Sequence, residues 1–466
     1  MVFSSVPFLF YFLPLFMAGY LLTPTIRGKN LTTLAFSLVF YGWGEPWFVL
    51  VLLVSIAGNW WAARRIDRLP EPSRRRLLVA AVVGNLALLA IFKYAAFVVG
   101  NLDVLLRPLG AALPIPRIAL PLGISFFTFH CLSYVIDVYR RRFPANRDLV
   151  EVALYIALFP QLIAGPIVRY GTIARQLRVR RHTLARASAG ARIFIIGLAQ
   201  KVLIADQVAP LVEAVFDNAA HPTLAESWCA LLAYTVQIYF DFAGYSSMAV
   251  GLGLCMGFSL PRNFRLPYTA LSITEFWRRW HMSLSAWLRD YLYIPLGGNR
   301  GPAWQTWRNL FAVFLLCGAW HGASWNFVLW GGWHGLFLAV ERAGLGRLLA
   351  LAPPPVRWAY TIAVVMGGWV LFRARDLTAA GSIWRGLLGF NDLPLGFYGR
   401  AALQPVVAVA LVAGCVLAVA PRWVRAPRLP RPLFAVADTA WTLALLALAV
   451  LSVAAGSYSP FLYFRF

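Results

Sequence analysis

Two histidines, His281 and His321, are the residues in this chain best suited to proton transfer. They lie in a stretch, residues 273–335, that holds three of the six histidines and nine of the nineteen tryptophans. An imidazole has a pKa near neutrality and can accept or return a proton at physiological pH. The two rings could act as a base and its orienting partner, or they could merely satisfy polar backbone between packed helices. The spacing alone leaves both interpretations open.

Two other kinds of site could be built from neighbouring residues. Cys317 precedes His321 by one helical turn, so a cysteine–histidine nucleophile pair is conceivable, although an apolar setting disfavours the reactive thiolate. A metal site would need three or four convergent ligands, for which His281, His321, His334 and Asp290 are the candidates. The sequence has no closely spaced HxxxH or HExxH ligand pair, and we expect no metal.

The segments that carry the two histidines differ in character. We predict one amphipathic, aromatic-rich helix over residues 271–292, at the cytoplasmic membrane interface, in which Glu275 and Arg279 lie one turn apart and can pair. Residues 294–298 (IPLGG) end it with turn-forming residues. Residues 307–335 form a predicted helical pair with His321 between its halves, and Gly322 leaves room there for a substrate or another backbone.

The elements that position these residues are expected to be membrane helices. The chain has 466 residues, of which 60% are hydrophobic and 13% charged, and its mean hydropathy is +0.68. Soluble domains are about one quarter charged. Repeated apolar runs, each long enough to cross about 30 Å of hydrocarbon, predict an all-α, polytopic membrane protein rather than a β-barrel. We expect 11–12 transmembrane helices plus re-entrant or amphipathic helices, in a single domain over residues 1–466.

The formal net charge of +24 comes almost entirely from arginine. Basic loops at residues 64–76 and 169–192 fit the positive-inside rule and place both loops in the cytoplasm. Nucleic-acid binding is not expected, because the arginines separate hydrophobic spans instead of covering one soluble face. The loop 169–192, which has seven arginines and no acid, is also a candidate surface for an anionic lipid or a polyphosphate.

Several spans contain residues that do not belong in plain lipid-facing helices. Gly44-Glu45-Pro46 predicts the turn of a helical hairpin, and the prolines at 160 and 166 predict a broken or re-entrant helix over residues 149–168. Asp241 lies within the span 228–250, where an unpaired carboxylate is costly. We therefore expect Asp241 to face a partner or a polar cavity.

An ordered set of motifs runs through the chain. The central motifs are residues 277–285 (WRRWHMSLS), 289–298 (RDYLYIPLGG) and 320–323 (WHGA). The others are residues 1–5 (MVFSS), 123–129 (GISFFTF), 160–166 (PQLIAGP), 241–246 (DFAGYS) and 460–466 (PFLYFRF). Together they resemble the membrane-bound O-acyltransferase (MBOAT) family, and within it the bacterial AlgI-like, alginate O-acetyltransferase branch. One departure is His130, where close relatives are expected to have glutamine.

The resemblance implies a function and a site. His321 matches the family's catalytic histidine, and His281 matches a second functional residue. The implied activity is O-acetylation of an exported polysaccharide such as alginate, with acetyl-CoA as the acyl donor and no permanently bound cofactor. The implied setting is the bacterial inner membrane, with a periplasmic SGNH-type partner. Other residues expected to bind substrate are Trp277, Arg278, Arg279, Trp280, Asp290, Trp320, Trp325 and Asn326.

Two alternatives stay open at this level. The first is D-alanyl transfer to teichoic acid by an enzyme of the DltB type, which would take a carrier-protein thioester in place of acetyl-CoA. The second, from a different class, is a transporter for a polysaccharide or lipid-linked sugar, since broken helices and intramembrane polar residues occur there as well. Transporters often contain inverted repeats, and this sequence has no visible internal repeat.

Overall fold

The computed structural model of the chain describes residues 1–420, 431–456 and 462, and these residues form helices and no strands. Two compact units can be distinguished. The first comprises Met1–Phe194 with Met248–Pro261, and the second comprises Ile195–Ser247 with Arg262–Phe466. Two of the three unit boundaries fall within helices, α9 (Leu184–Ala199) and α11 (Leu224–Cys255), and the third follows Pro261, in the segment after α11. A single domain over residues 1–466 stays a prediction.

Five helices are long and apolar enough to cross a membrane among the residues described. They are Phe48–Arg68, Ser73–Leu109, Leu184–Asn218, Pro354–Arg373 and Leu433–Ala454. Three shorter apolar helices accompany them, at Pro7–Leu22, Ile124–Tyr139 and Pro405–Val419. The prediction of an all-helical, multi-pass membrane protein is confirmed, whereas a total of 11–12 crossings stays a prediction.

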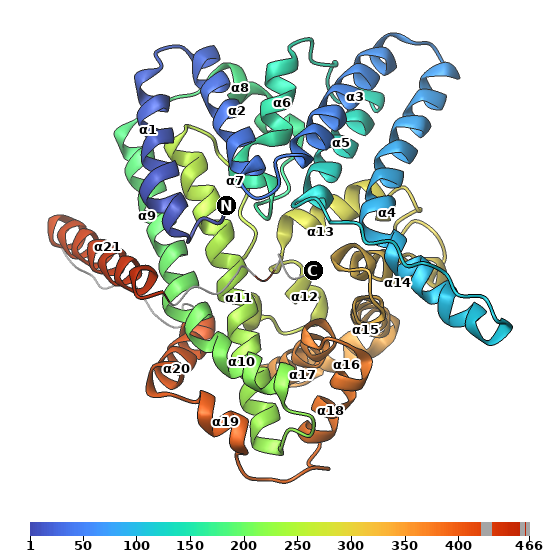
Figure 1. The fold of residues 1–466 in the computed structure, drawn as a ribbon, viewed down its shortest axis with the longest axis vertical. Helices are drawn as coiled ribbons and strands as arrows, with labels where there is room; N and C mark the ends of the chain where they lie inside the picture. The colour runs from blue at the N-terminus through green and yellow to red at the C-terminus, as the bar shows by residue number, and fades with distance from the viewer. Residues whose placement is uncertain (421–430, 457–461, 463–466) are drawn as a thin grey trace. The chain divides into compact units, whose positions relative to one another are not determined.

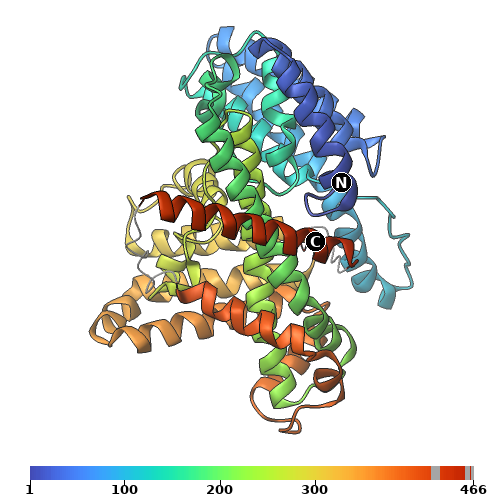
Figure 2. The ribbon, with the colours of Figure 1, turned by 90° about the vertical axis from the view of Figure 1, so that its left-hand side faces the viewer.

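The first unit contains the N-terminal helices. They are η1 (Pro7–Phe12), α1 (Leu13–Leu22), α2 (Ile26–Gly42), α3 (Phe48–Arg68), α4 (Ser73–Leu106), η2 (Arg107–Leu109), α5 (Ile124–Tyr139), α6 (Leu149–Ala157), α7 (Phe159–Leu162) and α8 (Tyr170–Arg178). Figure 2 shows α1 and α2 side by side in dark blue. The predicted turn at residues 44–46 is confirmed between α2 and α3. The predicted broken helix over residues 149–168 is also confirmed, but the break is at Leu158, and residues 159–162, including Pro160, form the short helix α7.

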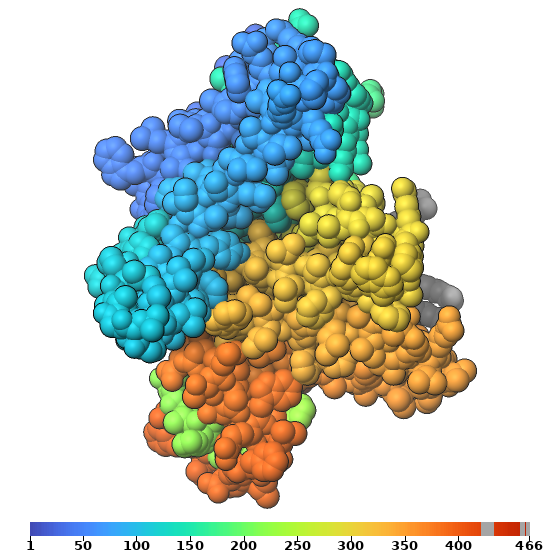
Figure 3. Space-filling model, turned by 90° about the vertical axis from the view of Figure 1, so that its right-hand side faces the viewer, coloured from blue at the N-terminus to red at the C-terminus, as the bar shows by residue number. Residues whose placement is uncertain are grey.

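The surface of the first unit is apolar along α3 and α4, which are blue in Figure 3. Val54, Val83 and Ile91 on these helices are each more than half exposed. Side chains of this kind are stable when they face hydrocarbon instead of water, in keeping with a membrane environment. Buried rings form the interior, where Phe16 and Phe40 pack against Phe159 with ring centroids 5.1 and 5.5 Å away.

The second unit contains the histidine-bearing stretch and the C-terminal helices. After α9 come η3 (Gln200–Ala205), α10 (Asp206–Asn218), α11, η4 (Pro267–Thr269), α12 (Ile273–Trp277), α13 (Met282–Leu288), η5 (Arg289–Tyr293), α14 (Ala303–His321) and α15 (Trp325–Val340). The remaining helices are η6 (Glu341–Leu345), α16 (Gly346–Leu351), α17 (Pro354–Arg373), α18 (Leu377–Leu387), α19 (Phe397–Ala402), α20 (Pro405–Val419) and α21 (Arg431–Ala454). As predicted, α14 and α15 form a helical pair, visible in Figure 1.

A buried ionic cluster joins three elements of the second unit. Lys201 Nζ lies 2.6 Å from a carboxylate oxygen of Asp206 and 2.7 Å from one of Asp241, and all three residues are almost fully buried. The second Asp241 oxygen accepts a hydrogen bond from the backbone N–H of Leu462 at 2.9 Å. The expectation that Asp241 faces a partner is confirmed. Apart from Leu462, the motif at residues 460–466 lies outside the described residues.

The continuous helix predicted over residues 271–292 is wrong. The chain forms α12, leaves the helical path at residues 278–281, and resumes as α13 and then η5. The break is at His281, whose φ of +42° is in the left-handed region that side chains other than glycine rarely adopt. The Glu275–Arg279 ion pair predicted from the helical spacing does form, at 2.5 Å, because the turn after α12 keeps the two residues close.

Candidate functional site

His281 occupies the position immediately before α13. Asn263 holds that helix end in place, since its carbonyl accepts from Met282 N at 2.9 Å and its side-chain oxygen accepts from Ser283 N at 3.2 Å. His281 is 1% exposed, and neither ring nitrogen forms a hydrogen bond to any residue in the part of the chain that the structure describes. A buried imidazole held by packing alone is available for a ligand or a reacting group.

Aromatic rings determine the orientation of His281. Phe242 on α11 packs edge-on against it, with ring centroids 4.7 Å apart. On another side, the ring of Trp320 lies 6.4 Å from His281 and 4.8 Å from His321. The indole of Trp320 is thus a shared neighbour of the two histidines, which lie in the same aromatic cluster of the second unit.

His321 is the last residue of α14 and is also buried. Its ring packs against Trp320, against Trp330 at 5.0 Å and against Phe372 at 5.1 Å, each nearly perpendicular to the imidazole. Edge-to-face packing of this kind fixes a ring in one orientation. The imidazole is therefore presented from the end of a helix by three fixed aromatic rings.

Close helix approach at glycines places His321. A Cβ atom on Gly318 would overlap the carbonyl oxygen of Phe327, and one on Gly331 would overlap that of Phe314. At Gly322, directly after His321, a Cβ would collide with the Phe327 ring. The sequence predicted that Gly322 leaves room for a substrate or another backbone; in the structure the space beside it is filled by the side chain of Phe327 instead.

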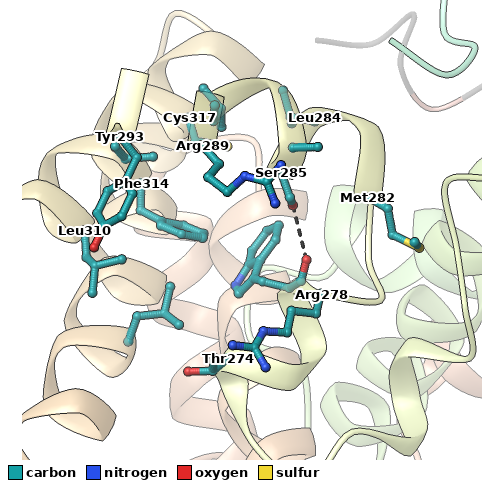
Figure 4. A pocket seen from close by; sticks show the side chains of 15 residues that line it. Thr274, Arg278, Met282, Leu284, Ser285, Arg289, Tyr293, Leu310, Phe314 and Cys317 are labelled. Carbon is teal, nitrogen blue, oxygen red and sulfur yellow. Dashed lines mark hydrogen bonds between the residues drawn. The ribbon is translucent and has the colours of Figure 1, made fainter. Parts of the chain in front are cut away.

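A pocket of about 510 Å³ opens beside this cluster, between the α12–η5 segment and the α14–α15 pair (Figure 4). Its wall is mostly apolar, with the guanidinium groups of Arg278 and Arg289 among the lining side chains. Ser285 donates to the Trp277 carbonyl at 3.2 Å within it. The full lining is Thr274, Trp277, Arg278, Met282, Leu284, Ser285, Ala286, Leu288, Arg289, Tyr293, Leu310, Val313, Phe314, Cys317 and Leu338.

The histidines adjoin this pocket through their neighbours in the chain. Met282, which follows His281, lines it, and so does Cys317, which lies one helical turn before His321. Neither imidazole itself belongs to the lining. The arrangement is a mostly apolar chamber next to a buried pair of proton-accepting rings.

The predicted substrate-binding residues divide into several groups. Trp277 and Arg278 line the pocket. Trp280 is buried in a second aromatic layer, 5.0 Å from Phe264 and 5.0 Å from Trp369. Arg279 has a structural position, because its guanidinium donates to Thr269 at 2.9 Å and pairs with Glu275.

The other predicted residues, Asp290, Asn326 and Trp325, do not line the pocket. Asp290 accepts from Arg289 at 2.6 Å, and this hydrogen bond raises the pKa of Arg289. Asn326 is buried and donates to the Ala374 carbonyl at 2.7 Å, which ties α15 to the end of α17. Trp325 is 53% exposed on the first turn of α15, so its place in a substrate tunnel stays a prediction.

Comparison with known proteins places this geometry in a family. The model of the MBOAT, membrane-bound O-acyltransferase family, matches residues 122–372, a range that includes both histidines and the whole pocket lining. The chain belongs to the MBOAT family. It is accordingly an acyltransferase, embedded in a membrane by several helices.

Three relatives show the range of the similarity. The chain is 42% identical to the "probable alginate O-acetylase AlgI" of Azotobacter vinelandii over 100% of both chains. It is 34% identical to the peptidoglycan O-acetyltransferase of Helicobacter pylori, covering 87% of this chain and 83% of that protein. It is 28% identical to the teichoic acid D-alanyltransferase of Bacillus subtilis, covering 43% of this chain and 53% of the other.

Several residues that shape this candidate site were not identified from the sequence. Trp330 and Phe372 contact His321, but nothing in the sequence separates them from other aromatic residues in apolar runs. Phe242 lies in the motif at residues 241–246, but the motif did not reveal its contact with His281. Glu341 was also missed. Its carboxylate accepts from Ile273 N at 2.7 Å and from Thr274 N at 3.0 Å, and so caps α12 from the end of α15. A lone acid after a long apolar run was the available signal.

His334 is fully buried on α15, where aromatic rings surround it next to the candidate site. Its ring lies 5.1 Å from Trp277 and 5.2 Å from Trp330, the tryptophan that also contacts His321. It is not close enough to join a metal-binding set with the others. Across the described ranges, no three His, Cys, Asp or Glu side chains converge as ligands.

Proposed function

We propose that the chain transfers acetyl groups from a cytosolic thioester, acetyl-CoA, for the O-acetylation of an exported polysaccharide such as alginate. The observation that carries the assignment is its 42% identity, over the full length of both chains, to the alginate O-acetylase of Azotobacter vinelandii. The peptidoglycan O-acetyltransferase at 34% identity supports the same transferred group on a different glycan. The chemistry is then acyl transfer from sulfur to oxygen.

His321 is the catalytic base in this proposal. Its imidazole takes the proton of the acceptor's hydroxyl group, while the oxygen of that hydroxyl adds to the carbonyl carbon of the thioester. The carbon–sulfur bond then breaks, and the imidazolium returns the proton to the departing thiolate. The buried position at the end of α14, one turn after pocket-lining Cys317, supports this role. Burial also strengthens hydrogen bonds and dipoles that stabilise the developing oxyanion.

His281 and the pocket supply the remaining parts. His281 acts as the second functional imidazole, oriented by Phe242. The pocket beside α12 and α13 receives the acyl donor: its apolar wall suits the acyl and pantetheine chain, and Arg278 suits a phosphate group. Trp277 forms part of the pocket wall, and Trp320 packs against both imidazoles.

The setting follows from the same assignment. The protein works in the bacterial inner membrane, with its arginine-rich loops toward the cytoplasm where the donor is made. The acceptor polymer is outside, so the acetyl group must be passed across. A periplasmic SGNH-type acetyltransferase is the partner we propose for the last transfer to the polysaccharide.

The decisive experiment replaces His321 with Ala in cells that make the acetylated polymer. Membrane insertion is followed by immunoblot, and polymer-bound acetate is measured after alkaline release. We expect normal insertion and loss of polymer acetate. The matched control is His221→Ala, which removes an exposed histidine from the loop before α11 and should leave acetylation unchanged. Full acetylation in the His321 variant would rule out its catalytic role.

Donor labelling separates the acetyl assignment from its alternatives. Purified protein with its polymer acceptor and partner is incubated with acetyl-labelled acetyl-CoA or with a D-alanyl carrier-protein thioester. We expect transfer from acetyl-CoA only. Transfer from the carrier thioester would indicate D-alanyl transfer, which the partial match to the Bacillus subtilis protein leaves as the alternative. Movement of polymer or lipid-linked sugar without acyl transfer would indicate a transporter.

A further inference from the structure

A group of mostly basic side chains gathers within the first unit. It comprises Tyr20, Lys29, Arg180, His182 and Arg186, named here the Arg180 cluster. These residues come from the end of α1, the start of α2, the segment after α8 and the first turn of α9. Residues 256–259, which follow α11, pack against them.

Arg180 is the buried centre of the cluster. It is 7% exposed, and its guanidinium lies 4.2 Å from the centre of the Phe258 ring. One terminal nitrogen donates to the side-chain oxygen of Asn30 at 2.8 Å and to the Gln176 carbonyl at 3.1 Å. The other terminal nitrogen and Nε are buried and have no acceptor in good hydrogen-bond geometry among the described residues, although the neutral Tyr20 hydroxyl lies close enough to interact with the guanidinium. A guanidinium has five N–H donors, and the acceptors supplied to this one are neutral.

Lys29 brings a second positive charge to the same place. It is 9% exposed; its ammonium donates to the Tyr20 carbonyl at 2.6 Å and lies 4.5 Å from the centre of the Tyr20 ring. Neither that carbonyl nor the ring carries a negative charge. Two cations removed from water without a carboxylate between them are unfavourable unless an anion compensates them. By contrast Arg178, two residues before Arg180, is paired with Glu151 at 3.0 Å.

The outer side of the cluster is formed by His182 and Arg186. The Tyr20 hydroxyl has one proton and donates it to the Met256 carbonyl at 2.6 Å, so His182 Nε2, 2.9 Å away, must be the donor to that hydroxyl. Partial burial of the imidazole ring, together with the charges of Arg180 and Lys29, lowers the pKa of His182. Arg186 donates to Ser259 Oγ at 2.8 Å. His182 is exposed, so its ring can turn away and open the path to Arg180.

Large apolar side chains surround this basic centre and face outward. Leu22 is 83% exposed, Val179 is 64% exposed and Leu184 is 86% exposed, and each is within two residues of a member of the cluster in the sequence. The basic loop 169–192 is cytoplasmic by the positive-inside rule. Exposed apolar residues beside buried cations are the combination expected where a protein meets the headgroups and the upper acyl chains of a bilayer.

We propose that the Arg180 cluster binds a phosphoryl group, the negative charge of which is compensated by Arg180 and Lys29, with His182 and Arg186 at the entrance. Guanidinium and ammonium groups are the usual protein partners of phosphate oxygens. The flanking apolar side chains favour the headgroup of an anionic phospholipid of the cytoplasmic leaflet as the source. A soluble phosphorylated compound has the same recognition chemistry and is the other source that the experiment distinguishes. This binding is a function additional to the acyl transfer proposed above and does not rest on it.

The test uses the full-length protein purified in detergent, stripped of lipid and titrated with phosphatidylglycerol, phosphatidylcholine or inorganic phosphate. Native mass spectrometry counts bound lipid, and the thermal midpoint reports stabilisation by either ligand. We expect one tightly retained phosphatidylglycerol and a raised midpoint, with no such effect from phosphatidylcholine. Stabilisation by inorganic phosphate with no preference for phosphatidylglycerol would support the phosphoryl site and overturn the lipid source. No response to either would overturn the proposal.

Variants then locate the effect. Arg180→Gln and Lys29→Gln should each weaken phosphatidylglycerol binding about tenfold or more, since each removes a charge-assisted hydrogen bond. Arg186→Gln, at the entrance, tests the site with a side chain that is less buried, and should weaken binding severalfold. The matched control is Arg175→Gln, which removes an exposed arginine from the last turn of α8. Equal affinity in the control and in all three cluster variants would overturn the assignment of these residues.

Discussion

The edge of the Phe242 ring packs against the imidazole of His281, with 4.7 Å between ring centroids and 87° between ring planes. One residue earlier, Asp241 is held by the buried ammonium of Lys201 at 2.7 Å. Neither nitrogen of His281 bonds to a described residue, so packing alone sets the orientation of this ring. The ionic cluster and the candidate site therefore share one turn of α11.

Phe242→Leu should reduce acyl transfer while the protein still folds. Leucine keeps most of the apolar volume but removes the flat ring edge that restrains His281. We expect turnover to fall about tenfold, because the His281 ring would no longer be held in one orientation. A tenfold loss corresponds to about 1.4 kcal/mol in barrier height. The measurement is acetyl transfer at saturating donor. Phe40→Leu is the matched control: Phe40 is a buried ring of the first unit that packs against Phe12 and Phe159, and its replacement should leave turnover within about twofold.

Lys201→Met should destabilise the protein strongly. The substitution leaves Asp206 and Asp241 buried beside each other without a cation, and removal of one partner from a buried ion pair costs about 3–5 kcal/mol. The measurement is the thermal midpoint in detergent. Arg375→Gln removes a surface pair, Arg375–Asp376, in which the side chains are 70% and 53% exposed, and it should change stability by less than about 1 kcal/mol. Equal midpoints for the two variants would show that the buried cluster contributes no more than a surface pair.

Apolar length and turn residues were enough to predict the membrane helices. The hairpin turn at Gly44-Glu45-Pro46 and the broken helix around Pro160 could be predicted from the sequence because glycine and proline act locally, although the break itself is at Leu158. His281 and His321 were identified as candidates because ionisable residues are rare in this chain, and the structure brings both into one aromatic cluster. Their roles in catalysis stay predictions.

The break inside residues 271–292 could not be predicted in the same way. Glu275 and Arg279 have helical spacing, and the segment has no proline or glycine before residue 295 to signal an interruption. The chain turns at His281 because distant residues cap both short helices. Asn263 caps α13 and Glu341 caps α12, and these contacts exist only after the chain has folded. The packing of Trp330 and Phe372 around His321 also forms only when the chain folds, so it could not be predicted from the sequence.

Cys317→Ala should leave acyl transfer largely intact. Cys317 lines the pocket one turn before His321, so a cysteine nucleophile is the competing mechanism for this site. If His321 acts directly on the acceptor hydroxyl, no bond to Cys317 forms during the reaction, and turnover should stay within about threefold, a change of less than about 1 kcal/mol in barrier height. Loss of activity comparable to that of His321→Ala, with trapping of acetyl on the wild-type thiol, would favour the cysteine mechanism.

Gly318→Ala should separate α14 from α15 and displace His321. The added Cβ would overlap the carbonyl oxygen of Phe327, and backbone atoms cannot move aside as a flexible side chain can. Overpacking of this kind costs about 1–3 kcal/mol. Because His321 follows three residues later on the same helix, we expect turnover to fall about tenfold or more, which corresponds to about 1.4 kcal/mol in barrier height. Donor transfer and the thermal midpoint are measured together.

Gly332→Ala is the control for this change, because the two glycines belong to the same helical pair but differ in their surroundings. A Cβ at Gly332 would have its nearest neighbour 3.8 Å away, at the side chain of Leu315, which is ordinary van der Waals contact. Replacing glycine with alanine within a helix stabilises it by about 1 kcal/mol where space permits. The control should therefore match or exceed the wild-type midpoint and keep its activity. If both variants behaved alike, the close approach at Gly318 would have no part in positioning His321.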